Sequence, residues 1–223
     1  MICHKTKCLF IHIPKTAGKS VSSLFGLPLQ AKDYKNPFSW IADPFGHASV
    51  TRYQSTPWFK DYFKFSFVRN PFDRLVSAFF YLNRGGINNS NQHFAENHLR
   101  EYQGNFRRFV LEGLESAIGH THFRPQASWI CNDGGLKPLV DFLGRYENLE
   151  NDIRRVSTHL RIPLSTIPHL NYSLRNEWPS YYDNESKTKV LDLYSQDFEL
   201  LGYNSLLRSS DIEHARGSFR MPK

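Results

Sequence analysis

The sequence predicts an α/β fold in three layers, with a central, mainly parallel sheet flanked by helices. Short apolar runs, typical of buried strands, alternate with longer stretches in which apolar residues recur at helical spacing. Strands that alternate with helices in this way form sheets that are mainly parallel. The chain has 223 residues, 40% of them hydrophobic, which suits one domain over residues 1–223 with a substantial core.

The first strand and helix are expected near the N-terminus. The apolar run from Cys8 to Ile13 is short and is closed by Pro14, so it predicts a buried strand. A tight turn must follow it. The helix after that turn is predicted from apolar side chains at helical spacing, namely Val21, Leu24 and Phe25.

The same arrangement is expected again further along the chain. Residues 63–68 predict a second buried strand, and Pro71 suits the first turn of the helix that follows. The apolar face of that helix carries Leu75, Val76, Phe79 and Phe80. Later stretches predict helices within residues 94–111, 147–160 and 184–200, and a third strand over residues 139–146.

The loop after the first strand is a candidate anion site. In an open α/β sheet, the backbone N–H groups and the helix dipole at this place both point toward a ligand. A nucleoside-triphosphate loop of the Walker A type would need glycine where this chain has Ile13. What remains is a loop able to hold the 5′ end of a nucleotide, with these residues: Lys15, Thr16, Ala17, Gly18, Lys19 and Ser20. The plainer interpretation is a strand-to-helix turn with two solvated lysines.

A second candidate anion site follows the second strand. Arg69 stands at the carboxyl end of that strand, where ligands bind in such sheets, and its planar guanidinium suits a phosphate. Ser77, two turns into the helix, offers a hydroxyl to the same anion. For Arg69 alone, a structural salt bridge to Asp73 is an equal alternative. Arg74 is expected to be structural.

Together the two segments resemble the phosphate-binding motifs of sulfotransferases that use 3′-phosphoadenosine 5′-phosphosulfate (PAPS). Residues 14–20 resemble the 5′-phosphosulfate loop of that family, and residues 67–78 resemble its 3′-phosphate motif. The likeness is greatest to the glycan-modifying branch with the heparan sulfate 2-O- and 6-O-sulfotransferases, whose first motif opens with the His-Ile-Pro-Lys-Thr found at residues 12–16. Residues 146–149 and 197–203 resemble later landmarks of the family. The resemblance implies a P-loop-like fold.

The resemblance also implies roles for individual residues. Lys15 would contact the bridging oxygen and the leaving 5′-phosphate, while Arg69 and Ser77 would bind the 3′-phosphate. Lys19 departs from the family pattern, in which many members carry Thr or Ser, so it would share or duplicate the role of Lys15. The other residues of the phosphosulfate loop would be Thr16, Ala17, Gly18 and Ser20.

A third segment is a candidate for a loop that closes over the phosphates of the nucleotide. It follows the turn at Pro168 and contains Asn171, Ser173 and Arg175. An equal alternative is that these three are ordinary turn residues.

His47 is the candidate general base. Histidine is the natural base near neutral pH, and transfer to a hydroxyl needs one. His47 lies between the two phosphate motifs, where the glycan sulfotransferases that this chain resembles place their catalytic histidine. The alternative is a structural or exposed histidine.

His120, His122 and Arg124 form a polar cluster expected to bind an acidic acceptor or the nucleotide. The His-x-His spacing also invites a metal interpretation. No third ligand is identifiable, and sulfuryl transfer from PAPS needs no metal, so no metal site is predicted.

The composition limits the partners and the compartment. A formal charge of +7 favours anions such as phosphates or acidic glycans. Three cysteines are too few for a disulfide framework, and no signal peptide or membrane segment is recognisable. These features predict a cytoplasmic protein. The acceptor is expected to be a glycan or another hydroxyl compound, and nucleic acid is not expected as a partner.

Two other functions stay open from the residues alone. A nucleotide or small-molecule kinase would use Lys19 and Ser20, but Ile13 and the lack of an aspartate after the second strand weigh against it. A basic module without catalytic activity would bind nucleic acid or an acidic polymer, and its binding would fall steeply with salt. Its candidate residues are Arg107, Arg108, Arg154 and Arg155.

Overall fold

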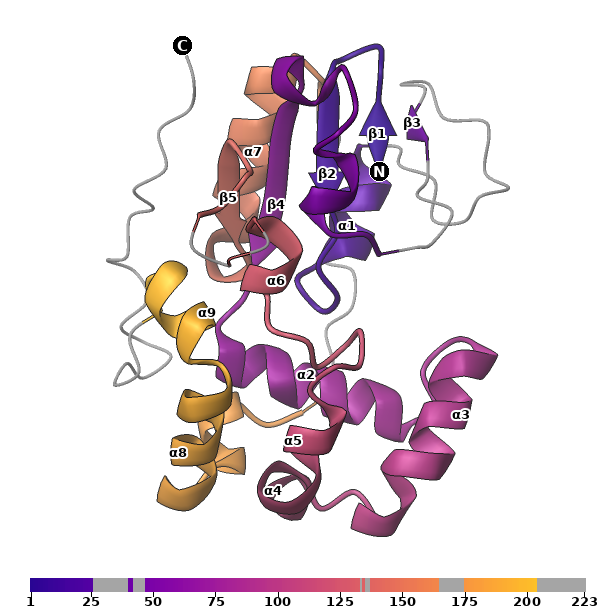
Figure 1. Ribbon diagram of the computed structural model, residues 1–223, viewed down its shortest axis with the longest axis vertical. Helices are drawn as coiled ribbons and strands as arrows, with labels where there is room; N and C mark the ends of the chain where they lie inside the picture. Colours follow the sequence, from indigo (N-terminus) through magenta and orange to yellow (C-terminus); the bar gives the residue numbers. More distant parts are fainter. Residues whose placement is uncertain (26–39, 42–46, 133, 135–136, 165–174, 204–223) are drawn as a thin grey trace. The chain divides into compact units, whose positions relative to one another are not determined.

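The computed structural model describes residues 1–25, 40–41, 47–132, 134, 137–164 and 175–203 (Figure 1). Contacts divide the chain into two compact units. The first comprises residues 1–69, 126–173 and 216–223, and the second comprises residues 70–125 and 174–215. A single domain over residues 1–223 stays a prediction, because two compact units can belong to one domain. Among the described residues, no helix is long and apolar enough to cross a membrane.

The first unit is built on a mixed sheet. Its strands lie in the order β3-β1-β2-β4-β5. β2 pairs with β4 and β4 pairs with β5 in parallel, whereas β1 pairs antiparallel with both β2 and β3. The bounds are Ile2–Cys3 for β1, Cys8–Ile11 for β2, Trp40–Ile41 for β3, Phe63–Val68 for β4 and Phe142–Arg145 for β5.

The α/β class is therefore confirmed. The sheet is mixed, because β2, β4 and β5 pair in parallel as predicted while β1 runs antiparallel to both of its neighbours. The reason is the short hairpin at the start of the chain, where the Lys7 amide donates to the His4 carbonyl at 3.4 Å and joins β1 to β2. Such a turn joins only antiparallel strands. β1 and β3 have two residues each, too few to show a strand period in the sequence.

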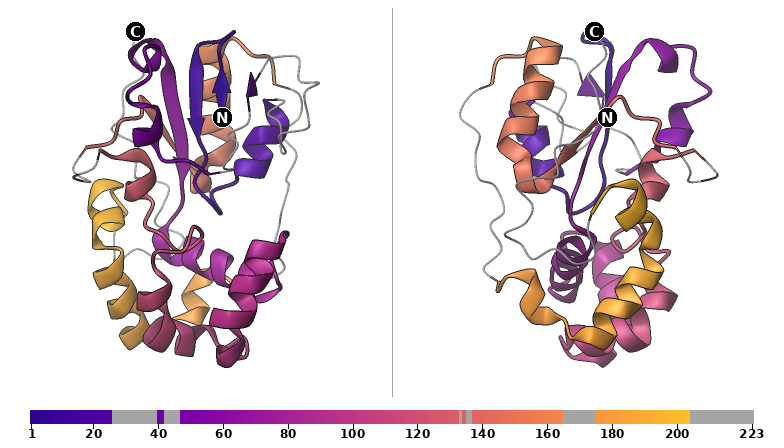
Figure 2. Two further views of the ribbon diagram at one scale, coloured as in Figure 1. Left: turned by 45° about the vertical axis from the view of Figure 1, so that its right-hand side comes forward. Right: turned by 90° about the vertical axis from the view of Figure 1, so that its left-hand side faces the viewer.

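Helices cover both faces of this sheet (Figure 2). Helices α1 (Gly18–Leu24) and α7 (Leu149–Leu160) pack on the face formed by alternate residues of β2 and β4. The buried cluster there includes Cys8, Phe10, Val21, Phe63, Phe65, Phe67, Ile153 and Val156. Short helices η1 (Val50–Tyr53), η2 (Phe59–Asp61) and α6 (Ala127–Ile130) lie on the opposite side (Figure 2). All six residues of β4 are buried, as expected for a central strand covered on both faces.

Lys64 is the one charged residue in β4. Lys64 is 7% exposed, and its ammonium group lies 2.8 Å from a carboxylate oxygen of Asp141. The same ammonium donates to the carbonyl of Tyr62 at 2.7 Å. A buried cation persists where it is paired and hydrogen-bonded, so Lys64 is structural.

The second unit is helical. Its central helix is α2 (Pro71–Asn83), which begins at Pro71 as predicted. The side chain of Asn70 caps this helix by accepting a hydrogen bond from the Phe72 amide at 3.0 Å. Near the end of the described chain lie η6 (Trp178–Tyr181), α8 (Asn184–Leu193) and α9 (Ser195–Leu200). The helix predicted over residues 184–200 is thus two helices that meet at Tyr194.

The helix predicted within residues 94–111 is also broken. The structure has α3 (Asn89–His98), η3 (Arg100–Tyr102), α4 (Phe106–Arg108), the π-helical turn η4 (Phe109–Gly113) and α5 (Leu114–Ala117). Gln103 and Gly104 have φ angles of 49° and 77°, and this left-handed pair ends the helical path. The strand and helix predicted over 139–146 and 147–160 are confirmed, as β5 and α7.

Candidate functional site

The parallel pairing of β2 with β4 brings the two predicted phosphate motifs to one edge of the sheet. Ile11 is the pairing partner of Ser66, and the Ser66 hydroxyl donates to the Ile11 carbonyl at 2.7 Å. Because parallel strands run in one direction, the loop after β2 and the residue after β4 leave the sheet at the same end. That end is where open α/β sheets bind their ligands.

The loop after β2 has an unusual backbone. Lys15 and Ala17 both have φ of 69°, in the left-handed region that residues with a Cβ seldom adopt. Thr16 between them is fully buried, and its hydroxyl donates to the Ile13 carbonyl at 2.9 Å. A left-handed residue followed by right-handed ones turns successive N–H groups toward a common point and forms an anion-binding concavity. Ala17 directly precedes α1 and provides this change of hand.

The two lysines of the loop differ in their surroundings. Lys15 is half-buried within the loop, whereas Lys19 is exposed in the first turn of α1. Ser20 is 3% exposed and thus belongs to the interior side of the helix. The half-buried position is the one that suits a lysine held against a bound phosphate, because an exposed ammonium group is strongly hydrated.

Gly18 makes room for a histidine. A Cβ added at Gly18 would lie 1.7 Å from Nε2 of His12, so the imidazole occupies the space that any side chain would need. The ring of His12 also stacks on Phe10, with centroids 5.7 Å apart and an interplanar angle of 15°. Glycine is therefore required here because of the close approach of the His12 ring.

His47 lies against the same loop. Its Nδ1 donates to the carbonyl of His12 at 2.8 Å, and the two imidazoles lie with centroids 4.4 Å apart. A carbonyl only accepts, so Nδ1 carries the proton, and in the neutral ring Nε2 carries the lone pair. The ring of Trp129 from α6 lies 6.1 Å from that of His47. The structure thus fixes the tautomer that a general base needs.

Arg69 connects the two phosphate motifs. The residue is 7% exposed, and its guanidinium lies 3.8 Å above the ring of Tyr146. Its Nη1 donates to the carbonyl of Lys15 at 3.2 Å. Asp73, the alternative partner expected for Arg69, forms an ion pair with Arg175 within the second unit.

Other predicted nucleotide residues belong to the second unit or to undescribed segments. Ser77 is half-buried on α2, so its role beside Arg69 stays a prediction. Asn171 and Ser173 lie outside the described residues. Arg175 is described, and its side chain, 11% exposed, bonds Asp73 of α2 within the second unit.

The cluster at residues 120–124 is tightly packed. His122 is 8% exposed, and its carbonyl and that of Arg124 accept bonds from Arg74 at 3.2 and 3.0 Å. Arg74 is 1% exposed, which confirms its structural role. His120 stacks on Phe94 with centroids 3.7 Å apart. Burial, and secondarily the nearby His98, lower the pKa of His120 to about 4.

A neutral His120 adds no positive charge to this cluster near pH 7. Arg124 is half-buried, and binding of an acidic acceptor by His120, His122 and Arg124 stays a prediction. Across the described ranges, no group of three or more histidine, cysteine or acidic side chains is arranged to hold a metal ion.

Comparison with known proteins identifies the family. The model of a family described as the sulfotransferase family matches residues 1–204. The chain belongs to the sulfotransferase family. This confirms the resemblance inferred from the two phosphate motifs.

Individual members of the family are distant. Carbohydrate sulfotransferase 14 of Homo sapiens is 25% identical over 233 residues, which cover 91% of this chain and 59% of that protein. Its counterpart in Mus musculus is 25% identical over 239 residues, with the same coverage. An uncharacterized protein of Archaeoglobus fulgidus is 30% identical over 106 residues, 47% of this chain and 72% of its own length.

The chain thus spans 59% of the length of the two carbohydrate sulfotransferases that it matches. No solved structure matches the chain.

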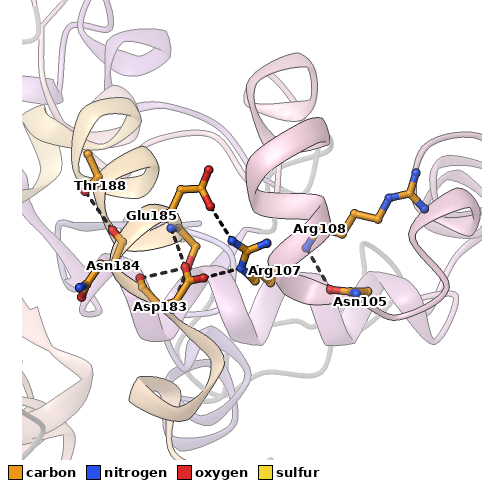
Figure 3. A network of polar contacts seen from close by, with 8 residues as sticks. Asn105, Arg107, Arg108, Asp183, Asn184, Glu185 and Thr188 are labelled. Atoms are coloured by element: carbon orange, nitrogen blue, oxygen red, sulfur yellow. Dashed lines mark hydrogen bonds and ion pairs between the residues drawn. The ribbon is translucent and has the colours of Figure 1, made fainter.

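The arginines that suggested a basic module are paired with carboxylates. Arg107 of α4 bonds Asp183 and Glu185 at the start of α8 (Figure 3). The other three form ion pairs within their own helical segments, which are Arg108 with Glu112, Arg154 with Glu150 and Arg155 with Asp152. The positive charge of each arginine is balanced by at least one neighbouring carboxylate. These residues therefore do not form a strongly positive surface of the kind that binds a polyanion.

Two residues of the site were not singled out from the sequence. His12 was noted only as part of the first motif, and Tyr146 only as part of a later one. The signal for His12 is the glycine at position 18, since glycine at the start of a helix often marks a close approach. Nothing in the sequence around Tyr146 indicates that its ring lies beside Arg69, because that contact depends on the pairing of β4 with β5.

Gly18→Ala is expected to destabilise the first unit by about 2 kcal/mol, the usual cost of overpacking, because the new methyl group displaces the His12 ring. The measurement is the free energy of unfolding in urea. His12→Ala in the same chain is the control, since it removes the ring and should recover part of the loss. Equal stability of Gly18→Ala and the parent chain would contradict the close approach.

Proposed function

We propose that this protein is a PAPS-dependent sulfotransferase that transfers a sulfuryl group to a hydroxyl group, most simply one on a carbohydrate. The observation that carries the proposal is the hydrogen bond from Arg69 to the carbonyl of Lys15. It joins the residue assigned to the 3′-phosphate to the loop assigned to the 5′-phosphosulfate. A nucleotide with a 3′-phosphate and a 5′-phosphosulfate needs two anion sites at a fixed distance from one another.

The chemical character of the site fits such a nucleotide. The loop offers backbone N–H groups from a left-handed to right-handed turn, together with the ammonium group of Lys15. Arg69 offers a planar guanidinium, the side chain best suited to a phosphate monoester. The remaining loop residues assigned to binding are Thr16, Ala17, Gly18, Lys19 and Ser20, and Ser77 is assigned to the 3′-phosphate.

In this proposal the residues divide the chemistry between them. PAPS supplies an activated sulfuryl group whose leaving group is a phosphate. His47 takes the proton of the acceptor hydroxyl at Nε2, as the acceptor oxygen bonds to sulfur and the bond from sulfur to the bridging oxygen breaks. Lys15 stabilises the negative charge that this oxygen retains on the 5′-phosphate. The products are a sulfate ester and 3′,5′-ADP.

A carbohydrate acceptor is supported by two observations. Two relatives of this chain are named carbohydrate sulfotransferase 14. The formal charge of +7 also suits an acidic glycan, because a positive protein attracts it at long range. We further propose that no metal takes part and that nucleic acid is not a partner.

We also propose a reducing compartment such as the cytoplasm. Cys3 and Cys8 are opposite one another in the pairing of β1 with β2, and both are free thiols. Burial raises the pKa of the Cys8 thiol to about 12, so it stays protonated and unreactive.

Calorimetric titration with 3′,5′-ADP tests the cofactor. Binding in the micromolar range, weakened by at least about tenfold in Arg69→Ala, is expected because one charge-assisted contact typically contributes about 1.5–3 kcal/mol. ATP with Mg²⁺ is the comparison ligand. Tighter binding of ATP with Mg²⁺ than of 3′,5′-ADP would contradict the proposal and favour the kinase alternative.

His47→Ala is expected to lower kcat by about 10²- to 10⁴-fold, the usual effect of removing a positioned base. Its affinity for 3′,5′-ADP should stay within about twofold of the parent value, because His47 is assigned to the acceptor. The measurement is the release of 3′,5′-ADP from PAPS with an acceptor glycan. Near-full activity of His47→Ala would show that another group is the base.

A further inference from the structure

Gln126 makes an unusual pair of hydrogen bonds to Arg69. Its side-chain oxygen accepts from the Arg69 amide at 2.9 Å, and its side-chain nitrogen donates to the Arg69 carbonyl at 2.8 Å. Gln126 is fully buried. Both backbone polar groups of Arg69 are therefore bonded by one side chain.

This pair of bonds takes the place of a strand neighbour. Arg69 directly follows Val68, the last residue of β4, which is the pairing partner of Arg145 in β5. The amide of Gln126 carries a donor and an acceptor side by side, as a peptide group does. It thereby continues the ordered backbone of β4 by one residue, to the residue whose side chain is assigned to the 3′-phosphate.

Gln126 stands at a particular place in the chain. Arg69 is the last residue of the first unit before residues 70–125, and Gln126 is the first residue after them. The backbone at Arg69 would otherwise continue from the sheet into the second unit with its polar groups unsupported by a strand. The α6 helix, which starts directly after Gln126, bonds the Gln126 carbonyl through the Trp129 amide at 3.0 Å and so fixes the position of Gln126.

The guanidinium depends on this backbone. It lies over Tyr146 and donates to the carbonyl of Lys15, and both contacts need the Cα of Arg69 at its present position. Recognition of a phosphate by a planar guanidinium is sensitive to displacements of well under 1 Å. An unfixed backbone at Arg69 would weaken the contact while leaving the charge in place.

We propose that Gln126 is a positioning residue for the 3′-phosphate of the nucleotide, acting through the backbone of Arg69. This inference rests on the proposed function, in which Arg69 binds that phosphate. It assigns to a neutral buried amide a part of the specificity for 3′-phosphorylated nucleotides.

The test compares two nucleotides that differ only in the 3′-phosphate, namely 3′,5′-ADP and 5′-AMP. The ratio of their affinities, measured by calorimetry, reports recognition of the 3′-phosphate alone. For the parent protein a ratio of about 10 to 100 is expected, falling at least about fivefold in Arg69→Ala, which leaves Ser77 in place. In Gln126→Met, which keeps the length of the side chain and loses both hydrogen bonds, the ratio should fall at least about fivefold.

Two further variants separate positioning from a general loss of stability. Ser66→Ala removes a buried bond between β4 and β2 and should leave the ratio within about twofold of the parent value. Gln126→Leu also loses both hydrogen bonds to Arg69 and adds no charge, and it serves if Gln126→Met does not fold. Its ratio should also fall at least about threefold.

The possible outcomes distinguish failure of the positioning role from failure of the proposed function. A parent ratio well above 1 that is unchanged in a folded Gln126 variant would overturn the positioning role and leave the proposed function standing. A parent ratio near 1 would overturn the proposed function, and the inference with it.

Discussion

The parallel pairing of β2 with β4 is the constraint on which the candidate site depends. It sets Ile11 beside Ser66, and it therefore places the loop after β2 and Arg69 after β4 at one edge of the sheet. The aromatic residues of β4 pack on the face covered by α1 and α7, so the apolar core holds this register. A shift by one residue would turn every side chain of β4 to the other face and bury Lys64 among phenylalanines. The packing that stabilises the core of the first unit thus also fixes the geometry of its candidate site.

Around this pairing, a few polar contacts adjust the positions of the reacting groups. The loop keeps two left-handed residues, Lys15 and Ala17, at a cost typical of strained backbone at functional sites. Arg69 bonds the carbonyl of the first of them, and the imidazole of His12 fills the space beside Gly18. His47 is oriented in turn by the carbonyl of His12. Each group is fixed by a neighbour that is itself buried or bonded, which is the usual way in which a catalytic site is preorganised.

Much of this was predictable because the decisive signals are local. The run of residues 63–68 has the length and apolarity of a buried strand, and Pro71 indicates where the next helix starts. The two-residue strands β1 and β3 have no period to detect, which is why the antiparallel pairings of β1 were not predicted. The break at Gln103 and Gly104 was not foreseen, since a left-handed Gln103 depends on its tertiary setting. Gln126 was not singled out from the sequence, because a glutamine that bonds a backbone 57 residues away leaves no local pattern.

The central claim is that one nucleotide spans the loop after β2 and the guanidinium of Arg69. A crystal structure of the protein with 3′,5′-ADP tests it most directly. The account predicts the 5′-phosphate at the N–H groups of residues 16–18 beside Lys15, and the 3′-phosphate on Arg69. A nucleotide bound in the reverse direction, with its 3′-phosphate in the loop, or bound elsewhere on the chain would contradict it.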